Sequence, residues 1–220
     1  MVGHKLNIKV ILDTVCPWCY IGKQRLDKAL ALAEEKWMDL EVTIDYAPYQ
    51  LDSWMGWHLE KIDVYREKFG EHMDSVLSRI TDVGRAEGIA FSFGGKTSNT
   101  LDPHRLIQYA RQFGQAAQGK VVESVLRRYF ELEQDIGDVE MLLSAAEDGG
   151  LDREAARAYL EQDSGTSAMH AEIESCRRFG STGVPFYIID GRFGVSGAQT
   201  PETFVSAFEE VFQRSENVTG

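Results

Sequence analysis

The chain has 220 residues, 43% of them hydrophobic, which is enough for one substantial core, either as a single domain or as a core with a large insert. Its formal net charge of -12 argues against nucleic acid or an anionic membrane as the main partner. No apolar run approaches the roughly 18 residues of a membrane-spanning helix, and the first residues lack the apolar stretch of a secretory signal. We therefore expect a cytoplasmic protein.

The first part of the chain alternates between strand and helix patterns. Residues 5–13 place apolar side chains at alternate positions and predict a largely buried strand. A helical pattern follows at once, and residues 41–46 predict a second strand. A strand, a helix and a strand in close succession form a βαβ unit, which favours parallel pairing of the two strands.

The middle of the chain, residues 51–165, carries helical patterns throughout. Within it, Asp102 is predicted to cap a helix that has Pro103 in its first turn. Beyond this block the chain predicts another helix, a hairpin over residues 186–196 and a final helix from Thr200-Pro201-Glu202.

This order predicts an α/β fold in which one small core is interrupted by a large all-helical insertion. We assign residues 1–51 and 166–220 to the core and residues 52–165 to the insertion.

The three cysteines are too few, and odd in number, for a structural disulfide framework. Cys16 and Cys19 stand where the first strand has ended and a helix begins, and Pro17 suits the first helical position. A helix N-terminus favours the thiolate form of a cysteine, which is the form that attacks disulfides. We expect Cys16 to be the exposed nucleophile and Cys19, one turn deeper, to be the less accessible resolving thiol.

This cysteine pair has two other interpretations, a zinc site and a purely structural pair. A zinc site needs about four ligands, but the chain has no second C-x-x-C and its histidines show no ligand spacing near Cys16, so no metal is expected. A purely structural pair is the other alternative. The remote Cys176 lies on an apolar helical stripe and is expected to be buried and inert.

Four segments resemble the FrnE-like branch of the DsbA oxidoreductase family, and they occur in the family's order over nearly the whole chain. They are Asp13-Thr14-Val15-Cys16-Pro17-Trp18-Cys19-Tyr20-Ile21-Gly22, Asn99-Thr100-Leu101-Asp102-Pro103-His104-Arg105-Leu106, Gly183-Val184-Pro185-Phe186-Tyr187 and Val195-Ser196-Gly197-Ala198-Gln199.

The resemblance implies a thioredoxin core with a helical insertion, and a cis-proline, Pro185, that faces the thiols. It also implies that the Val184 backbone pairs with an extended substrate. The related kappa glutathione transferases and 2-hydroxychromene-2-carboxylate isomerases carry serine in place of Cys16. If their glutathione scaffold is shared, Val184, Ser196, Gly197 and Gln199 are the positions that would touch glutathione or a substrate backbone.

Other residues have weaker assignments. Trp18, between the thiols, is expected to tune the redox potential, and Asn99 and His104 are expected to line the cleft between core and insertion. Trp54, Met55 and Trp57 are expected to pack at the domain junction.

The leading hypothesis is thiol–disulfide exchange on a protein or small-molecule substrate by a monomer or homodimer, with no tightly bound cofactor and glutathione as a potential co-substrate. The alternatives are a glutathione-dependent isomerase or transferase acting on a small aromatic or polyketide-like substrate, and a non-catalytic binding or chaperone module.

Overall fold

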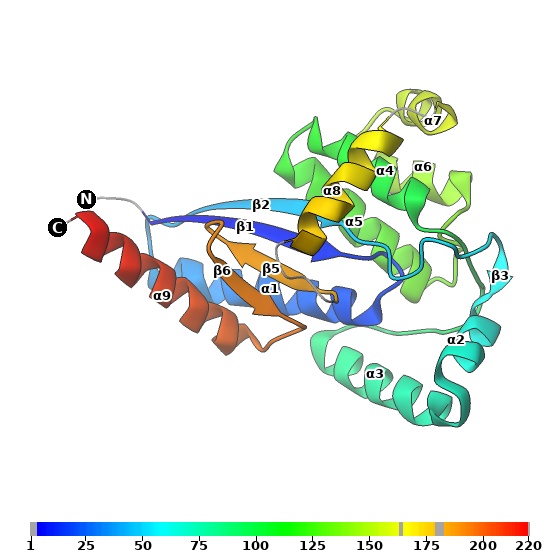
Figure 1. The fold of residues 1–220 in the computed structure, drawn as a ribbon, viewed down its shortest axis with the longest axis horizontal. Helices are drawn as coiled ribbons and strands as arrows, with labels where there is room; N and C mark the ends of the chain where they lie inside the picture. The colour runs from blue at the N-terminus through cyan, green and yellow to red at the C-terminus, as the bar shows by residue number, and fades with distance from the viewer. Residues whose placement is uncertain (1–3, 163–164, 179–182, 220) are drawn as a thin grey trace.

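The computed structural model describes residues 4–162, 165–178 and 183–219. At its centre is a mixed sheet of four strands in the order β2-β1-β5-β6 (Figure 1). β1 (Lys5–Leu12) pairs in parallel with β2 (Glu41–Pro48), as the βαβ pattern predicted. On its other side β1 pairs antiparallel with β5 (Phe186–Ile189), which forms the predicted hairpin with β6 (Phe193–Ser196).

The two faces of the sheet are covered by different helices. α1 (Pro17–Lys36) and α9 (Pro201–Thr219) contact each other on one face, whereas α8 (Thr166–Arg178) lies across the other (Figure 1). Alternate residues of β1 serve the two faces, because successive side chains of a strand point in opposite directions. Ile8 and Val10 enter the main core, while Ile11 packs with Cys176 of α8 in a smaller cluster.

The segment between β2 and α8 is a helical insertion that lies at the carboxyl ends of β1 and β2 (Figure 1). Its helical elements are α2 (Lys61–Phe69), a 3₁₀ turn (Gly70–His72), α3 (Met73–Glu87), α4 (Leu101–Arg111), α5 (Gln115–Phe130), α6 (Val139–Asp148) and α7 (Arg153–Glu161).

The α/β fold with a helical insertion is confirmed, with two local corrections. The insertion is not entirely helical, because the connection after α3 returns past the start of α2 and forms a short ladder between β3 (Leu59–Glu60) and β4 (Lys96–Thr97). Helix α4 begins before the predicted cap: Thr100 is its N-cap residue, and Asp102 pairs instead with Arg105 at 2.8 Å.

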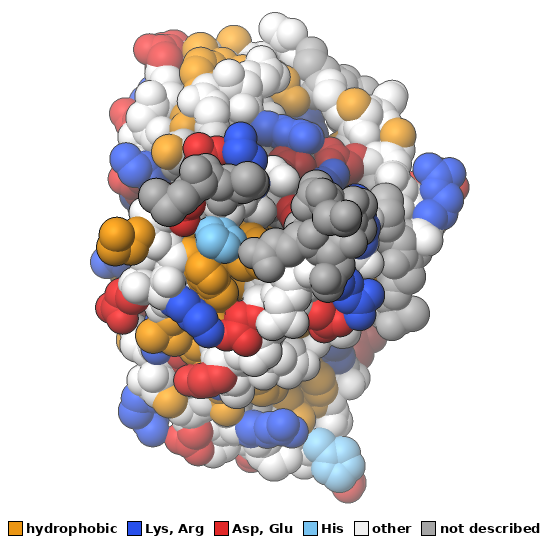
Figure 2. All heavy atoms as spheres, turned by 90° about the vertical axis from the view of Figure 1, so that its left-hand side faces the viewer, with side chains coloured by type: hydrophobic (Ala, Val, Ile, Leu, Met, Phe, Trp, Pro, Cys, Tyr) orange, Lys and Arg blue, Asp and Glu red, His pale blue; other side chains and the backbone are white. Residues whose placement is uncertain are grey.

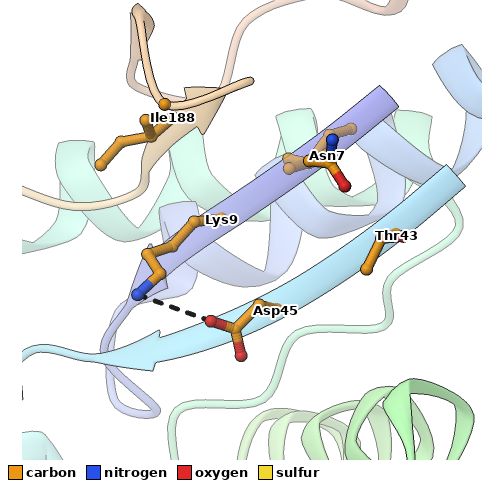
Figure 3. A pocket seen from close by; sticks show the side chains of 7 residues that line it. Asn7, Lys9, Thr43, Asp45 and Ile188 are labelled. Carbon is orange, nitrogen blue, oxygen red and sulfur yellow. Dashed lines mark ion pairs between the residues drawn. The ribbon is translucent and has the colours of Figure 1, made fainter. Parts of the chain in front are cut away.

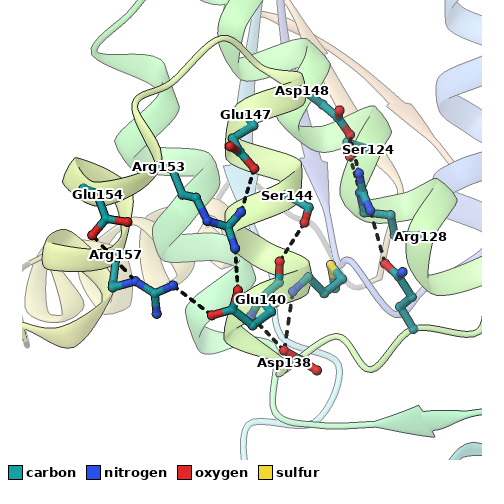
Figure 4. A network of polar contacts seen from close by, with 12 residues as sticks. Ser124, Arg128, Asp138, Glu140, Ser144, Glu147, Asp148, Arg153, Glu154 and Arg157 are labelled. Atoms are coloured by element: carbon teal, nitrogen blue, oxygen red, sulfur yellow. Dashed lines mark hydrogen bonds and ion pairs between the residues drawn. The ribbon is translucent and has the colours of Figure 1, made fainter.

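A polar network stabilises the outer part of the insertion (Figure 4). The Arg153 guanidinium contacts Glu140 and, at 2.6 Å, Glu147, while Arg157 contacts Glu140 at 2.8 Å. The Asp138 carboxylate accepts the Glu140 backbone N–H at 2.7 Å and so caps α6. The charged pairs join α7 to α6 at the surface.

The surface shows no single dominant charged region on the face presented in Figure 2, where acidic, basic and hydrophobic side chains are interspersed. Within the described part of the chain, no helix is both long and apolar enough to span a membrane.

A pocket of about 270 Å³ lies on the face of the sheet where Lys9 pairs with Glu172 of α8 at 3.4 Å. Figure 3 shows side chains that line it. Lys9 and Asp45 point toward each other there, with their charged atoms 3.5 Å apart. No cysteine lines this pocket, so it is separate from the dithiol chemistry.

Candidate active site

The dithiol lies at the N-terminus of α1, as the sequence predicted. Cys16 is the N-cap residue, with extended backbone angles (φ -93°, ψ 111°), and Pro17 occupies the first helical position. The Cys16 N–H donates to the Asp13 carbonyl oxygen at 3.1 Å, and the Cys19 N–H donates to the Cys16 carbonyl oxygen at 3.0 Å. These two bonds place the cysteines one turn apart at the positive end of the helix.

Both thiols are largely covered, which corrects the expectation that Cys16 is exposed. Cys16 is 5% exposed and Cys19 only 1%. The cover over Cys16 includes the segment before β5: its Sγ donates to the Val184 carbonyl oxygen at 3.6 Å. Cys16 is still the more accessible of the two thiols, as expected for a nucleophile with Cys19 as the resolving thiol.

Burial raises the pKa of the Cys19 thiol well above its ordinary value. A hydrogen bond with the Cys16 sulfur and the negative charge of a Cys16 thiolate raise it further. This hydrogen bond joins the two sulfurs, and Cys19 is the thiol that burial keeps protonated.

The Val184-Pro185 peptide bond is cis, as the resemblance implied. Gly22 of α1 permits the close approach of this segment, since a Cβ there would lie 2.2 Å from Tyr187 Oη and 3.0 Å from Pro185 Cγ. The Gly197 N–H donates to the Pro185 carbonyl oxygen at 2.8 Å. Helix, cis-proline and the end of β6 thus meet beside the dithiol.

Two predicted ligand positions adjoin Gly197. Ser196 is exposed at the end of β6, and the Gln199 side chain donates to the Ser196 carbonyl oxygen at 2.7 Å. The structure thus brings these residues to the Pro185 segment, and their contact with a ligand stays a prediction.

His104 does not line a cleft: it is 1% exposed and lies beneath the dithiol loop. Its Nε2 is 3.3 Å from Asp13 Oδ1 and 2.8 Å from the Tyr49 carbonyl oxygen. Both neighbours accept hydrogen bonds, so Nε2 carries a proton. The other Asp13 oxygen accepts the Leu51 N–H at 2.7 Å. The histidine therefore supports the loop that carries Cys16.

Asn99 is also a structural residue. Its side-chain oxygen accepts the Leu101 N–H at 2.9 Å at the start of α4, and its amide donates to the Ser53 and Met55 carbonyl oxygens at 3.0 and 3.3 Å. Those bonds connect the loop after β2 with α4.

Trp18 is half-buried rather than fully exposed, and the Arg79 guanidinium of α3 lies 5.6 Å from its ring centroid. The insertion thus contacts the residue between the two thiols. A role of Trp18 in tuning the redox potential stays a prediction.

Sequence reasoning did not identify Lys61 and Tyr65 of α2, which line a pocket together with Val15, the neighbour of Cys16. Lys61 is 1% exposed and its Nζ donates to the Tyr129 carbonyl oxygen at 2.7 Å. Burial lowers the pKa of Lys61 to about 8, against an ordinary value of 10.5, although Glu133 and Asp135 oppose the shift. The available signal was the four-residue spacing, which puts both side chains on one helical face.

This lowered pKa predicts a pH-dependent stability. Between about pH 8 and pH 10.5 the unfolded chain keeps a proton on Lys61 that the folded chain has lost, so the folded state gains stability as the pH rises. Relative to Lys61→Met, the wild-type free energy of unfolding should rise by about 2 kcal/mol from pH 7.5 to pH 10. Urea denaturation at both pH values measures this, and equal changes in the two proteins would contradict it.

The comparisons with known proteins agree with this geometry. A probable DsbA oxidoreductase from Streptomyces coelicolor superposes with a TM-score of 0.84 at 28% identity, covering 94% of this chain and 90% of the other. A 2-hydroxychromene-2-carboxylate isomerase superposes at 0.68 with 16% identity, covering 97% and 100%. The cytosolic disulfide reductase DsbM from Pseudomonas aeruginosa, solved with GSH, superposes at 0.62 with 16% identity, covering 94% and 99%.

The last two similarities concern the fold alone. The family assignment comes from the sequence profile of the DSBA-like thioredoxin domain, which matches residues 7–209, from within β1 into α9. The match spans the dithiol, the helical insertion and the cis-proline segment, so the chain belongs to the DSBA-like thioredoxin domain family.

Proposed function

We propose that the protein is a thiol–disulfide oxidoreductase in which Cys16 attacks the substrate and Cys19 resolves the mixed disulfide. One observation carries the proposal: two sulfurs in contact at the N-terminus of α1, the outer one at the N-cap and the inner one protonated by burial. The N-terminal end of the helix stabilises a thiolate on Cys16, and the cysteine spacing allows the inner sulfur to displace the substrate.

The exchange runs in two steps. The Cys16 thiolate attacks one sulfur of a disulfide, forms a mixed disulfide and releases the other sulfur as a thiolate. Cys19 then loses its proton and attacks the Cys16 sulfur, which releases the second substrate thiol and leaves an oxidised Cys16–Cys19 pair. The disulfide substrate gains two electrons and the protein dithiol loses two.

The Val184 backbone supports substrate positioning in this proposal. Its carbonyl oxygen lies 3.6 Å from the Cys16 sulfur, so an extended substrate that pairs with this segment would bring its own sulfur to the nucleophile. Glutathione fits as a co-substrate rather than as a bound cofactor, in keeping with the GSH present in the DsbM structure. We place the reaction in the cytoplasm, where DsbM also acts.

An insulin-reduction assay, together with oxidation of reduced ribonuclease, tests the proposal. Cys16→Ser should lower both activities to the uncatalysed background, because serine cannot form the mixed disulfide. Cys176→Ser is the matched control: it removes a buried thiol from the far face of the sheet and should leave both activities unchanged. Full activity of Cys16→Ser would overturn the proposal.

A glutathione-dependent isomerase or transferase would give a different result. Such an enzyme does not cycle a disulfide, so Cys19→Ser would retain full turnover of its substrate. A binding or chaperone module would keep its activity when both cysteines are replaced.

A further inference from the structure

A pocket of about 470 Å³ lies next to the dithiol, between the loop that carries Cys16 and the start of the insertion. Val15 and Leu51 line it from the core side, and Lys61, Tyr65, Thr97 and Tyr129 line it from the insertion side. Its volume falls within the range of small-molecule pockets.

Lys61 brings an incompletely compensated positive charge to this pocket. Its Nζ donates to one carbonyl oxygen and lies 3.8 Å from the centroid of the Tyr129 ring. Among the residues that the structure describes, no carboxylate oxygen lies within 4 Å of it. A buried ammonium normally has a paired anion, because its desolvation is expensive.

Tyr65 adds a polar group whose hydroxyl has no hydrogen-bond partner among the described residues. The residue is 7% exposed, and its hydroxyl is buried with no hydrogen-bond acceptor in the described part of the chain. Burial and the negative charge of Cys16 raise the pKa of this phenol, so the hydroxyl stays protonated and lies within electrostatic reach of the reacting sulfur. A buried O–H without an acceptor is uncommon in folded proteins.

We propose that this pocket binds a carboxylate of a low-molecular-weight thiol or disulfide whose sulfur exchanges with Cys16, with Lys61 Nζ and Tyr65 Oη as donors. This substrate class rests on the exchange reaction proposed above. Exposed charged side chains complete the lining, namely Asp52, Glu67 and Lys68. The two acidic groups favour a singly charged ligand group over a dianion such as phosphate.

Thiol–disulfide exchange with such a substrate needs no further oxidant or reductant. Cys16 displaces one carboxylate-bearing thiolate from the disulfide, and Cys19 displaces the second as it gives up its proton. The protein dithiol is oxidised to a disulfide while one substrate disulfide becomes two thiols. In the reverse direction the same pocket would hold the incoming thiol.

Two disulfide probes with similar carbon chains test the assignment: dithiodipropionate, which ends in carboxylates, and hydroxyethyl disulfide, which is neutral. The second-order rate constant for oxidation of the reduced protein is measured with each. Lys61→Met should slow the reaction with dithiodipropionate by about 10- to 100-fold, the size expected for loss of a charged hydrogen bond, and leave the reaction with hydroxyethyl disulfide within about twofold.

Tyr65→Phe should slow the dithiodipropionate reaction by about 2- to 10-fold while keeping the buried ring. Lys96→Met is the matched control. Lys96 is exposed, lies outside the pocket and stands opposite Glu60, the residue before Lys61, in the β3–β4 ladder. The Lys96→Met variant removes a nearby positive charge of the same kind and should leave the ratio of the rates with the two disulfides unchanged.

A non-reducible probe separates this proposal from the exchange reaction itself. Thiodipropionate is a thioether with the same carboxylates, and its binding can be followed by calorimetry whether or not the dithiol reacts. It should bind wild type and Cys16→Ser alike and bind Lys61→Met at least about 10-fold more weakly.

If neither disulfide reacts with wild type but thiodipropionate binds through Lys61, the exchange function fails and the carboxylate site stands. The site itself is overturned if Lys61→Met and Tyr65→Phe slow both disulfides equally or neither, or if thiodipropionate binding is indifferent to Lys61.

Discussion

Replacement of His104 by alanine is expected to lower the free energy of unfolding by about 3 to 5 kcal/mol. The imidazole and the Asp13 carboxylate are 1% and 0% exposed, and their nearest atoms are 3.3 Å apart. Without the ring, the carboxylate keeps the Leu51 N–H but loses its side-chain partner, and the Tyr49 carbonyl oxygen loses a donor. Removing the partner of a buried charge lowers the free energy of unfolding far more than breaking an ion pair at the surface does.

The chain offers a second His–Asp pair as a control, in which the imidazole is exposed and the carboxylate is largely buried. His58 lies 2.5 Å from Asp135, and its side chain is 60% exposed. His58→Asn breaks this pair, and asparagine tolerates the positive φ of 57° at that position. We expect a loss of less than about 1 kcal/mol, because solvent reaches the His58 ring and the Asp135 carboxylate keeps its hydrogen bonds from the Ser98 hydroxyl and the Gly137 N–H.

Urea denaturation of both variants at neutral pH compares the two pairs. The His104 variant should also lose exchange activity in parallel with its stability, because Asp13 accepts the Cys16 N–H through its carbonyl oxygen. Equal and small losses at both positions would show that the Asp13 carboxylate does not depend on His104.

The sequence predicted the parts of this molecule that depend on local pattern. Alternating apolar residues in β1 and β2, with helix α1 between them, were enough for the parallel pair, and Cys16-Pro17 marked the N-terminus of α1. These features follow from periodicity and capping rules within a few neighbouring residues. The small α/β core followed from the order of these elements along the chain.

Local sequence patterns do not predict contacts between segments that are far apart in the chain. His104 lies 91 residues from Asp13, and nothing in its neighbourhood in the sequence shows that the chain folds them together. Lys61 looked like a surface lysine, yet it is buried against Tyr129 of α5. Trp54 gave the opposite error: it was expected to pack at the domain junction and is 94% exposed.

The resemblance to a known family supplied what pattern could not. From composition alone, Pro185 suited the first position of a strand equally well without facing the dithiol. Only the surrounding motif pointed to its cis bond and to its place beside the thiols, and the contact of Gly22 with Pro185 and Tyr187 is consistent with that placement.

The pKa of Cys19 indicates how the second step is timed. Its three largest causes of elevation are burial, the hydrogen bond with the Cys16 sulfur and the negative charge of Cys16. Once Cys16 enters a mixed disulfide, that sulfur is neutral and the last two causes weaken. In the proposed exchange, Cys19 then ionises more readily only after the substrate is attached, so it does not compete with Cys16 for the first attack.

Cys19→Ser should consequently stop the reaction after its first step. With hydroxyethyl disulfide, wild type should release two thiols per protein, whereas the variant should release one and retain the other half of the probe on Cys16. Release of that half then needs an external thiol, which lacks the effective concentration of a group one helical turn away. We expect the mixed disulfide to persist at least about 10³-fold longer than in wild type.

Thiol release and intact-protein mass spectrometry measure this outcome together. Cys176→Ser should behave as wild type, because its thiol lies in the cluster under α8 with Ile11 and Ile188. Cys16→Ser should release no thiol, which distinguishes attack by the N-cap sulfur from attack by the buried one. If Cys19→Ser released two thiols as fast as wild type, the second displacement would come from another group, and the ordered ionisation inferred from the contact between the two sulfurs would be wrong.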